Sequence, residues 1–204
     1  MLIASPDQFC SLILNEGLWH TTSSDRLEAI VASGAIKVEP AISDNERHKT
    51  ANGPANYPFA RSIGAVSIFD FSNFDPAGYG VRFPVSNWRA FVPCYHKWSR
   101  AIWIEIDATE CGSKIISGAA LLNRWRMEEA YAHTLMPHIE GAHVGDIPIT
   151  AIKNVLVASP TDNAAWEVEL VDLKASQSAP APQQTSPPQA QYPPLEKSGH
   201  PRLC

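Results

Sequence analysis

Two segments of this sequence combine a reactive side chain with a setting that suits ligand chemistry. His20 ends a short apolar run and is followed by the hydroxyl residues Thr21 and Thr22. A histidine beside hydroxyl groups at a strand-to-helix junction presents donors and acceptors to a polar ligand, and a helix start attracts phosphate. The alternative is that the hydroxyl groups only cap a helix and that His20 has a structural role.

Glu140 is the second candidate and lies in the strand-like segment MPHIEGAHVGDIPI, next to Gly141. A carboxylate beside an open glycine position can face a cleft, where it stabilises a developing cation or orients a hydroxyl. An exposed strand glutamate is the alternative. His133, His138 and His143 lie nearby at a spacing of five residues. Neither a helix nor a strand puts that spacing on one face, so no metal site is predicted.

The charge balance limits the choice of partner. The 204 residues carry a formal net charge of -5, which argues against a large, sequence-blind nucleic-acid footprint. A local basic groove stays open, because the stretch from residue 61 to residue 100 concentrates basic side chains: Arg61, Arg82, Arg89, Lys97 and Arg100. A solvated loop surface would produce the same pattern.

The cysteines and the N-terminal segment predict a cytoplasmic protein without a membrane partner. The four cysteines form no CxxC pair and no zinc-type spacing, which favours a reducing compartment. The segment MLIASPDQF has neither a basic region nor a long apolar core, so no signal peptide is predicted. No run of 18 apolar residues occurs, so no membrane span is expected.

The periodicity of the chain predicts an α+β domain over residues 1–173. Ser5 before Pro6 signals one helix start, and Asp25 with Glu28 signals another as a capping box, closed by Gly34. The expected helices cover about 6–16, where Gly17 ends the first one, then 25–33 and 116–129. The expected strands cover 18–21, 36–38, 65–69, 101–106, 139–144, 153–158 and 166–171. Residues 174–204 are rich in proline and lack apolar periodicity, so they are predicted to form a disordered tail.

Two stretches lack a clear period. Residues 39–62 contain Asn, Asp, Gly and Pro punctuation and are predicted to form a long loop. Loops of that length inside a domain are often functional. Residues 72–98 are rich in Phe, Tyr and Trp. These rings could stack on nucleobases, but the better interpretation is that they belong to the core.

Three blocks of the chain, in this order, resemble DarT-type ADP-ribosyltransferases. The first is the apolar strand ending in His20, followed by a helix that closes on Ser33-Gly34. The second is Arg61, just before the strand at 65–69. The third runs from His138 through the strand that bears Glu140 to an Ile-Pro turn and a final apolar strand. Together the blocks span roughly residues 16–159.

The resemblance implies a split β-sheet core that holds NAD as a substrate, without a metal. Glu140 would hold the ribose 2'-hydroxyl and stabilise the oxocarbenium-like transition state, because the glycosidic carbon becomes cationic as nicotinamide leaves. Arg61 would contact the NAD phosphates or the acceptor, and the loop at 39–62 would cover NAD and limit hydrolysis. The residues assigned to NAD binding are His20, Thr21, Thr22, Ser67 and Tyr57.

The resemblance therefore predicts a mono-ADP-ribosyltransferase that acts on DNA first, then on protein or RNA, in a toxin or defence setting with an antitoxin or hydrolase partner. The acidic net charge of the chain departs from the basic acceptor surface expected of a DNA-modifying enzyme. Two other hypotheses stay open. One is an NAD-dependent RNA 2'-phosphotransferase-like enzyme, which would rely on several arginines. The other is a non-enzymatic binding or immunity module, in which His20 and Glu140 would lie far apart or in unrelated contacts.

Overall fold

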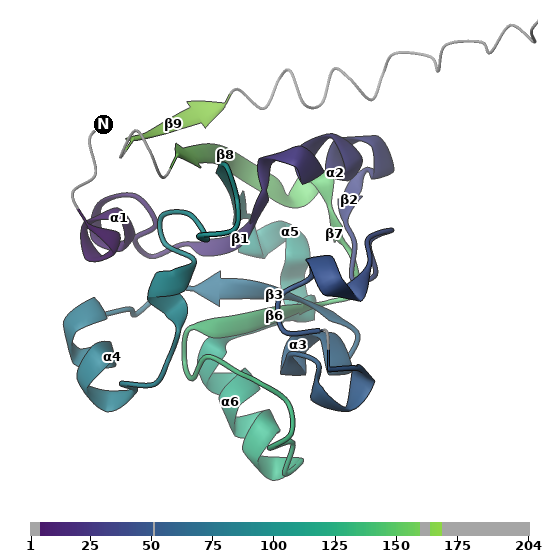
Figure 1. The fold of residues 1–204 in the computed structure, drawn as a ribbon, viewed down its shortest axis with the longest axis vertical. Helices are drawn as coiled ribbons and strands as arrows, with labels where there is room; N and C mark the ends of the chain where they lie inside the picture. The colour runs from purple at the N-terminus through teal and green to yellow at the C-terminus, as the bar shows by residue number, and fades with distance from the viewer. Residues whose placement is uncertain (1–4, 51, 160–163, 169–204) are drawn as a thin grey trace, which may run out of the picture.

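The computed structural model of the protein describes residues 5–50, 52–159 and 164–168. Its centre is a seven-stranded sheet in the order β5-β6-β3-β1-β4-β8-β9, in which every neighbouring pair is antiparallel (Figure 1). The strands are β1 Leu18–Ser23, β3 Ala65–Asp70, β4 Ala101–Ile106, β5 Ile115–Ile116, β6 Glu140–Val144, β8 Ile152–Ser159 and β9 Ala164–Val168. A small second sheet pairs β2 Ala35–Ile36 with β7 Ile147–Pro148. The predicted mixture of α and β elements is confirmed.

Helices and single helical turns connect these strands. The helices are α1 Pro6–Leu12, α2 Leu27–Ser33, α3 Phe59–Ser62, α4 Pro76–Arg82, α5 Ala108–Cys111 and α6 Gly118–Met127. The 3-10 turns are η1 Ser24–Arg26, η2 Asp44–Glu46, η3 Pro54–Asn56, η4 Trp88–Ala90, η5 Gly112–Lys114 and η6 Ile149–Ala151. Five of these elements lie in the two stretches that lack a clear period: η2, η3 and α3 in residues 39–62, and α4 and η4 in residues 72–98.

The two predicted helix starts have different outcomes. Ser5 caps α1 as expected, because its hydroxyl accepts a hydrogen bond from the Gln8 N–H at 3.2 Å. The capping box of Asp25 and Glu28 is wrong: Asp25 instead accepts from the Ser23 hydroxyl, and α2 begins only after the turn η1. Gly34 ends α2 as predicted, in the left-handed conformation with φ 69°, where glycine pays no steric penalty.

Strand β4 is buried on both of its faces, which explains its continuous apolar sequence. Trp103 faces an aromatic cluster, which the helices α1 and α4 and the segment around η4 complete. Ile102 and Ile104 face an aliphatic cluster, to which α2, α5 and the small β2–β7 sheet contribute. A third cluster joins α3 and α6 to β3 and β6. The aromatic residues of 72–98 therefore belong to the core or pack against it, as predicted.

The sheet divides between β1 and β3. Strand β1 pairs with β4 over five residues, from Trp19 to Ser23, but it pairs with β3 only at Leu18 and Trp19. Beyond Trp19 the two strands no longer pair, so their facing edges lie open to other partners. In Figure 1, β1 and β8 lie with α2 in the upper part of the molecule, and β3 and β6 lie with α6 in the lower part.

Several predicted boundaries change. Residues 72–98 include the helix α4, which Asp75 caps by accepting from the N–H groups of Ala77 and Gly78. The strand expected at 36–38 is the two-residue β2 at 35–36. The tail predicted at 174–204 lies outside the described residues. Among the helices that the structure describes, none has the length and apolar character needed to span a membrane.

Candidate active site

His20 lies at the point where β1 leaves β3. Its Nδ1 is 3.0 Å from the carbonyl oxygen of Ser67 on β3. A carbonyl can only accept, so Nδ1 carries the proton and Nε2 is left as an acceptor. Burial lowers the pKa of His20; the Ser67 hydrogen bond opposes this, and the charge of Arg26 adds to it. The side chain is therefore neutral at pH 7 and offers an acceptor to a ligand hydroxyl.

Glu140 is held by the Ser67 side chain and by the Met136 backbone. The Ser67 hydroxyl donates to Oε1 at 2.9 Å, and the backbone N–H of Met136 donates to Oε2 at 2.8 Å. The residue is only 4% exposed. Burial raises the pKa of Glu140, while the two hydrogen bonds and the charge of Lys49 act in the opposite direction. Ser67 thus connects His20 and Glu140 through its carbonyl and its hydroxyl.

Gly141 has a different role from the one expected. A Cβ at this position would lie 2.9 Å from the carbonyl oxygen of Ile116 and 3.3 Å from the side chain of Ile68. The glycine lets β5 approach β6 closely, because any side chain would meet the neighbouring backbone. It does not open a cleft beside Glu140.

A cavity of about 630 Å³ lies along the division of the sheet, within the size range of small-molecule sites. Six of the seven predicted site residues line it, namely His20, Thr21, Thr22, Arg61, Ser67 and Glu140. They come from β1, α3, β3 and β6. The predicted loop at 39–62 lines the same cavity with Glu39, Pro40, Ala41, Ile42, Arg47, His48, Lys49, Thr50, Pro58 and Arg61.

The two threonines after His20 differ in their contacts. The Thr21 hydroxyl donates to the carbonyl oxygen of Ile102 on β4 at 3.2 Å. Thr22 is 5% exposed. The Thr21 contact ties this end of β1 to β4, on the side away from β3. This end of β1 is thereby held by β4, and the His20 side chain is its hydrogen-bonded contact with β3.

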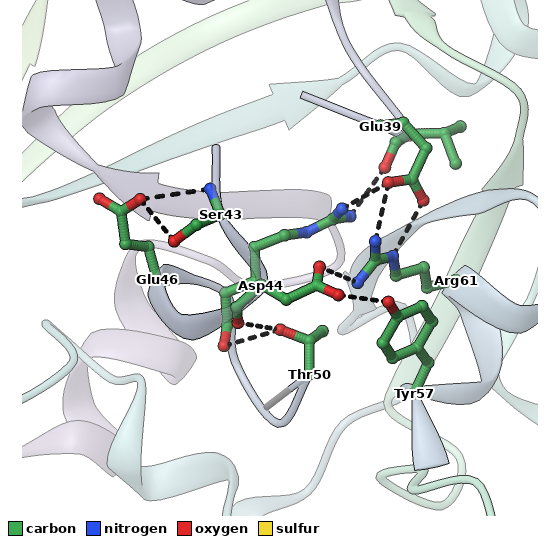
Figure 2. Close-up of polar contacts among 9 residues, drawn as sticks. Glu39, Ser43, Asp44, Glu46, Thr50, Tyr57 and Arg61 are labelled. Atoms are coloured by element: carbon green, nitrogen blue, oxygen red, sulfur yellow. Dashed lines mark hydrogen bonds and ion pairs between the residues drawn. The ribbon is translucent and has the colours of Figure 1, made fainter. Parts of the chain in front are cut away.

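Arg61 is held by two carboxylates of the preceding loop (Figure 2). Its guanidinium contacts Glu39 through Nε at 2.9 Å and Nη2 at 2.8 Å, and Asp44 through Nη1 at 2.8 Å. The Arg61 side chain is 11% exposed. The hydrogen bonds from Arg61 lower the pKa of the Glu39 carboxyl, and the hydrogen bond from the Tyr57 hydroxyl, followed by that from Arg61, lowers the pKa of Asp44. In this conformation the positive charge of Arg61 is already neutralised.

Tyr57 supports this ion-pair network and does not line the cavity. Its hydroxyl donates to Asp44, and the guanidinium of Arg61 lies 3.7 Å from the centre of its ring. The bond to Asp44 raises the pKa of the Tyr57 hydroxyl. One face of the Tyr57 ring is therefore covered by Arg61, and its hydroxyl is hydrogen-bonded to Asp44. The structure thus places Tyr57 beside Arg61 and not among the residues that line the cavity, and its assignment to NAD binding stays a prediction.

The sequence interpretation missed a second group of cavity residues, contributed by His48, Lys49, Phe91 and Trp98. The His48 ring packs edge-on against Phe91, with 4.7 Å between ring centres. Burial, with smaller effects from Lys49 and Lys97, lowers the pKa of His48 to about 4. The adjacent basic residues His48 and Lys49 in the predicted loop at 39–62 were the sequence signal that could have indicated this group. Nothing in the sequence indicates that Phe91 would meet it across the cavity.

The three evenly spaced histidines are separated in the structure. His133 Nδ1 bonds the Tyr57 carbonyl at 2.8 Å, and the buried His143 bonds the Gly145 carbonyl at 3.0 Å. His138 packs beside the ring of Phe83. Over the described residues, no three His, Cys, Asp or Glu side chains gather in a way that could hold a metal ion.

No family model matches this sequence, and no curated protein matches it. The geometry of the cavity is therefore the basis for a functional assignment.

Proposed function

We propose that this protein is a mono-ADP-ribosyltransferase that uses NAD as its substrate and transfers ADP-ribose to a macromolecular acceptor. The observation that carries the proposal is the chain of contacts His20–Ser67–Glu140 on the wall of one cavity. The meeting of His20 and Glu140 at one serine agrees with a shared role in binding one ligand.

In the proposed reaction, the bond between C1' of the ribose and the nicotinamide nitrogen breaks, and nicotinamide leaves with the electron pair. The cationic C1' then bonds to a nucleophile of the acceptor, which loses a proton. Glu140 holds the ribose 2'-hydroxyl and stabilises the positive charge that develops beside it. In a buried site such a carboxylate acts strongly, because little water screens it.

Within the same proposal, His20 binds a ribose hydroxyl through Nε2, Thr21 lies beside the nicotinamide amide, and Thr22 also belongs to the NAD-binding residues. Ser67 fixes the positions of the Glu140 carboxylate and the His20 imidazole relative to each other. Residues 39–50 cover the substrate and limit hydrolysis. The cytoplasmic location, the toxin or defence setting and an antitoxin or hydrolase partner stay predictions of the resemblance.

The two alternatives receive less support. A binding module would have left His20 and Glu140 in unrelated contacts, whereas both bond Ser67. An RNA 2'-phosphotransferase-like enzyme would need a cluster of arginines for the RNA phosphate. Arg82, Arg89 and Arg100 do not line the cavity, and Arg89 pairs with Asp7 on α1. The acceptor, DNA first and then protein or RNA, stays a prediction of the resemblance.

The test is the release of nicotinamide from NAD by the purified protein, alone and with single-stranded DNA, duplex DNA, RNA or a cell lysate. We expect release to rise with one acceptor class and to disappear in Glu140→Ala. Mass spectrometry of that acceptor should show an added ADP-ribose. Absence of release under every condition, together with absence of NAD binding, would overturn the proposal in favour of a binding module.

A further inference from the structure

The cavity wall carries five basic side chains, four of which already have partners. Each of the four contacts a carboxylate or a backbone carbonyl of its own surroundings. The pairs are Arg26 with the Glu46 carbonyl, Lys37 with Asp146, Arg47 with Glu39 and the Val38 carbonyl, and Arg61 with Glu39 and Asp44. A ligand that needed Lys37, Arg47 or Arg61 would have to displace a carboxylate. Arg26 contacts only a neutral carbonyl, so it keeps its charge while its Nη2 is engaged.

Lys49 is the fifth and differs from the rest. It is exposed, it lines the cavity, and among the residues that the structure describes it has no hydrogen-bond or ion-pair partner. Its backbone has φ 53°, in the left-handed region that a lysine rarely adopts. Residues held in such conformations occur preferentially at ligand sites, where the surrounding structure has to impose them.

The neighbours on both sides impose this conformation. His48 packs edge-on against Phe91 and Tyr95, and the Thr50 hydroxyl donates to the carbonyl oxygens of Asp44 and Arg47. Thr50 is 2% exposed. The backbone at Lys49 is therefore fixed, while its side chain keeps the freedom to meet a ligand.

The charge of Lys49 acts on Glu140, which lines the same cavity. It lowers the pKa of the Glu140 carboxyl, against the larger and opposite effect of burial. The cavity wall thus carries a buried carboxylate from β6 and a free ammonium group from the loop. A substrate with a cationic ring at one end and a diphosphate beyond it would match this order of charges.

We propose that Lys49 binds the diphosphate of the dinucleotide substrate and that Arg61 is a positioning residue, which holds the loop through Glu39 and Asp44. The inference rests on the proposed function. A lysine suits this role because its ammonium binds phosphate as a point charge without a fixed orientation. It changes the role given to Arg61 by the resemblance, since that guanidinium is neutralised in the structure.

The test is calorimetric titration of the full chain with NAD, ADP-ribose and nicotinamide riboside, the last of which has no phosphate. Lys49→Ala should weaken the affinity for NAD and ADP-ribose about 10-fold to 100-fold, the usual worth of a charge-assisted contact. The affinity for nicotinamide riboside should stay the same. Lys49→Arg should recover most of the loss.

Lys114→Ala is the matched control, because Lys114 is exposed, does not line the cavity, and its removal changes the net charge equally. It should leave all three affinities unchanged. Raising the salt concentration should weaken ADP-ribose binding more in the wild type than in Lys49→Ala. Equal unfolding temperatures of the variants would exclude a folding effect.

The outcomes separate this inference from the proposed function. If the wild type binds ADP-ribose and Lys49→Ala binds it equally well, Lys49 has no phosphate role and the proposed function stands. If Lys49→Ala binds the dinucleotide normally but loses affinity for DNA, Lys49 serves the acceptor and this inference is wrong. If the wild type binds neither NAD nor ADP-ribose, the proposed function falls and this inference with it.

Discussion

At the scale of single residues, a carboxylate that is 4% exposed and held by two hydrogen bonds lowers the stability of the fold when it is charged. Replacement of Glu140 by glutamine keeps the shape and one acceptor oxygen but removes the charge. We expect Glu140→Gln to reduce nicotinamide release about 100-fold or more. Its unfolding temperature at pH 7 should not fall. If Glu140 had only a structural role, Glu140→Gln would lower the unfolding temperature and leave nicotinamide release unchanged.

Glu105 on β4 provides the matched control for that variant. Its carboxylate contacts Lys153 at 2.8 Å and Asn154 at 2.6 Å, and it lies outside the cavity wall. Glu105→Gln should lower the unfolding temperature slightly, because it breaks an ion pair, and should retain nicotinamide release. Loss of activity in both variants, or a lower unfolding temperature in Glu140→Gln alone, would contradict the role given to Glu140.

His48 should make the stability depend on pH. Burial lowers its pKa from 6.5 to about 4 in the folded state, so the unfolded chain binds the proton more readily. The contribution of His48 to stability is therefore present above pH 6.5 and is lost as the pH falls towards 4. We expect the unfolding temperature of His48→Gln to fall less between pH 7.5 and pH 5 than that of the wild type. Parallel profiles would contradict this. His20 acts in the same direction and remains in both proteins.

At the scale of elements, the strands were the easiest to predict and their contacts the hardest. The apolar runs at 65–69 and 101–106 indicate strands because buried strands collect β-branched and aromatic residues. The helix α4 was missed, because Gly78 and Gly80 weaken its helical pattern. Its start was readable in Asp75 and Pro76, a capping residue followed by proline at the first helical position.

In the site, too, the residues could be predicted from the sequence but their contacts could not. His20 and Glu140 could be selected from their residue types and neighbours. Their common contact with Ser67 depends on how β1 leaves β3 after Trp19, and strand pairing between distant segments leaves no local signal. The partners of Arg61 lie 17 and 22 residues before it in the chain. Their choice depends on how the loop folds back, which the sequence pattern does not define.

The loop that covers the cavity should be loosened by removing its anchor. Arg61→Ala deletes the contacts to Glu39 and Asp44 and uncovers Tyr57. Because both carboxylates regain water, the expected loss is about 1–2 kcal/mol in the free energy of unfolding. Hydrogen exchange should accelerate at the amides of residues 42–50. Binding of ADP-ribose should weaken as well, since Lys49 loses its fixed position.

Arg124→Ala is the control for that prediction. Arg124 pairs with Glu128 on the exposed side of α6, with 43% and 45% of the two side chains accessible. Such a pair is worth only about 0.3–0.5 kcal/mol. Its loss should leave the exchange of residues 42–50 unchanged. An Arg61→Ala variant with the same exchange pattern as the wild type would show that other contacts hold the loop.

At the scale of the whole molecule, the order of the longer strands was predictable but their pairing was not. Strand β1, near the start of the chain, lies in the middle of the sheet between β3 and β4. Composition and periodicity fix which residues are buried but not which strand lies beside which. The three clusters that cover the sheet therefore emerge only once the topology is known.

The end of the domain follows from this topology. Strand β9 pairs with β8 over five residues, from Ala164 to Val168, and covers an edge that contains the buried Ala158 and Ser159. Truncation after residue 173 keeps this pairing and removes only the proline-rich segment. We expect nicotinamide release and the unfolding temperature to match those of the full chain.

Truncation after residue 163 should behave differently, because it deletes β9 and leaves β8 as an unpaired edge. Exposed apolar strand edges pair with other molecules. We therefore expect a lower unfolding temperature and aggregation that rises with protein concentration, measured by calorimetry and light scattering. If the 163 truncation were as stable and monodisperse as the 173 truncation, β9 would not belong to the folded unit. If both truncations lost stability equally, the boundary of the domain would lie beyond residue 173.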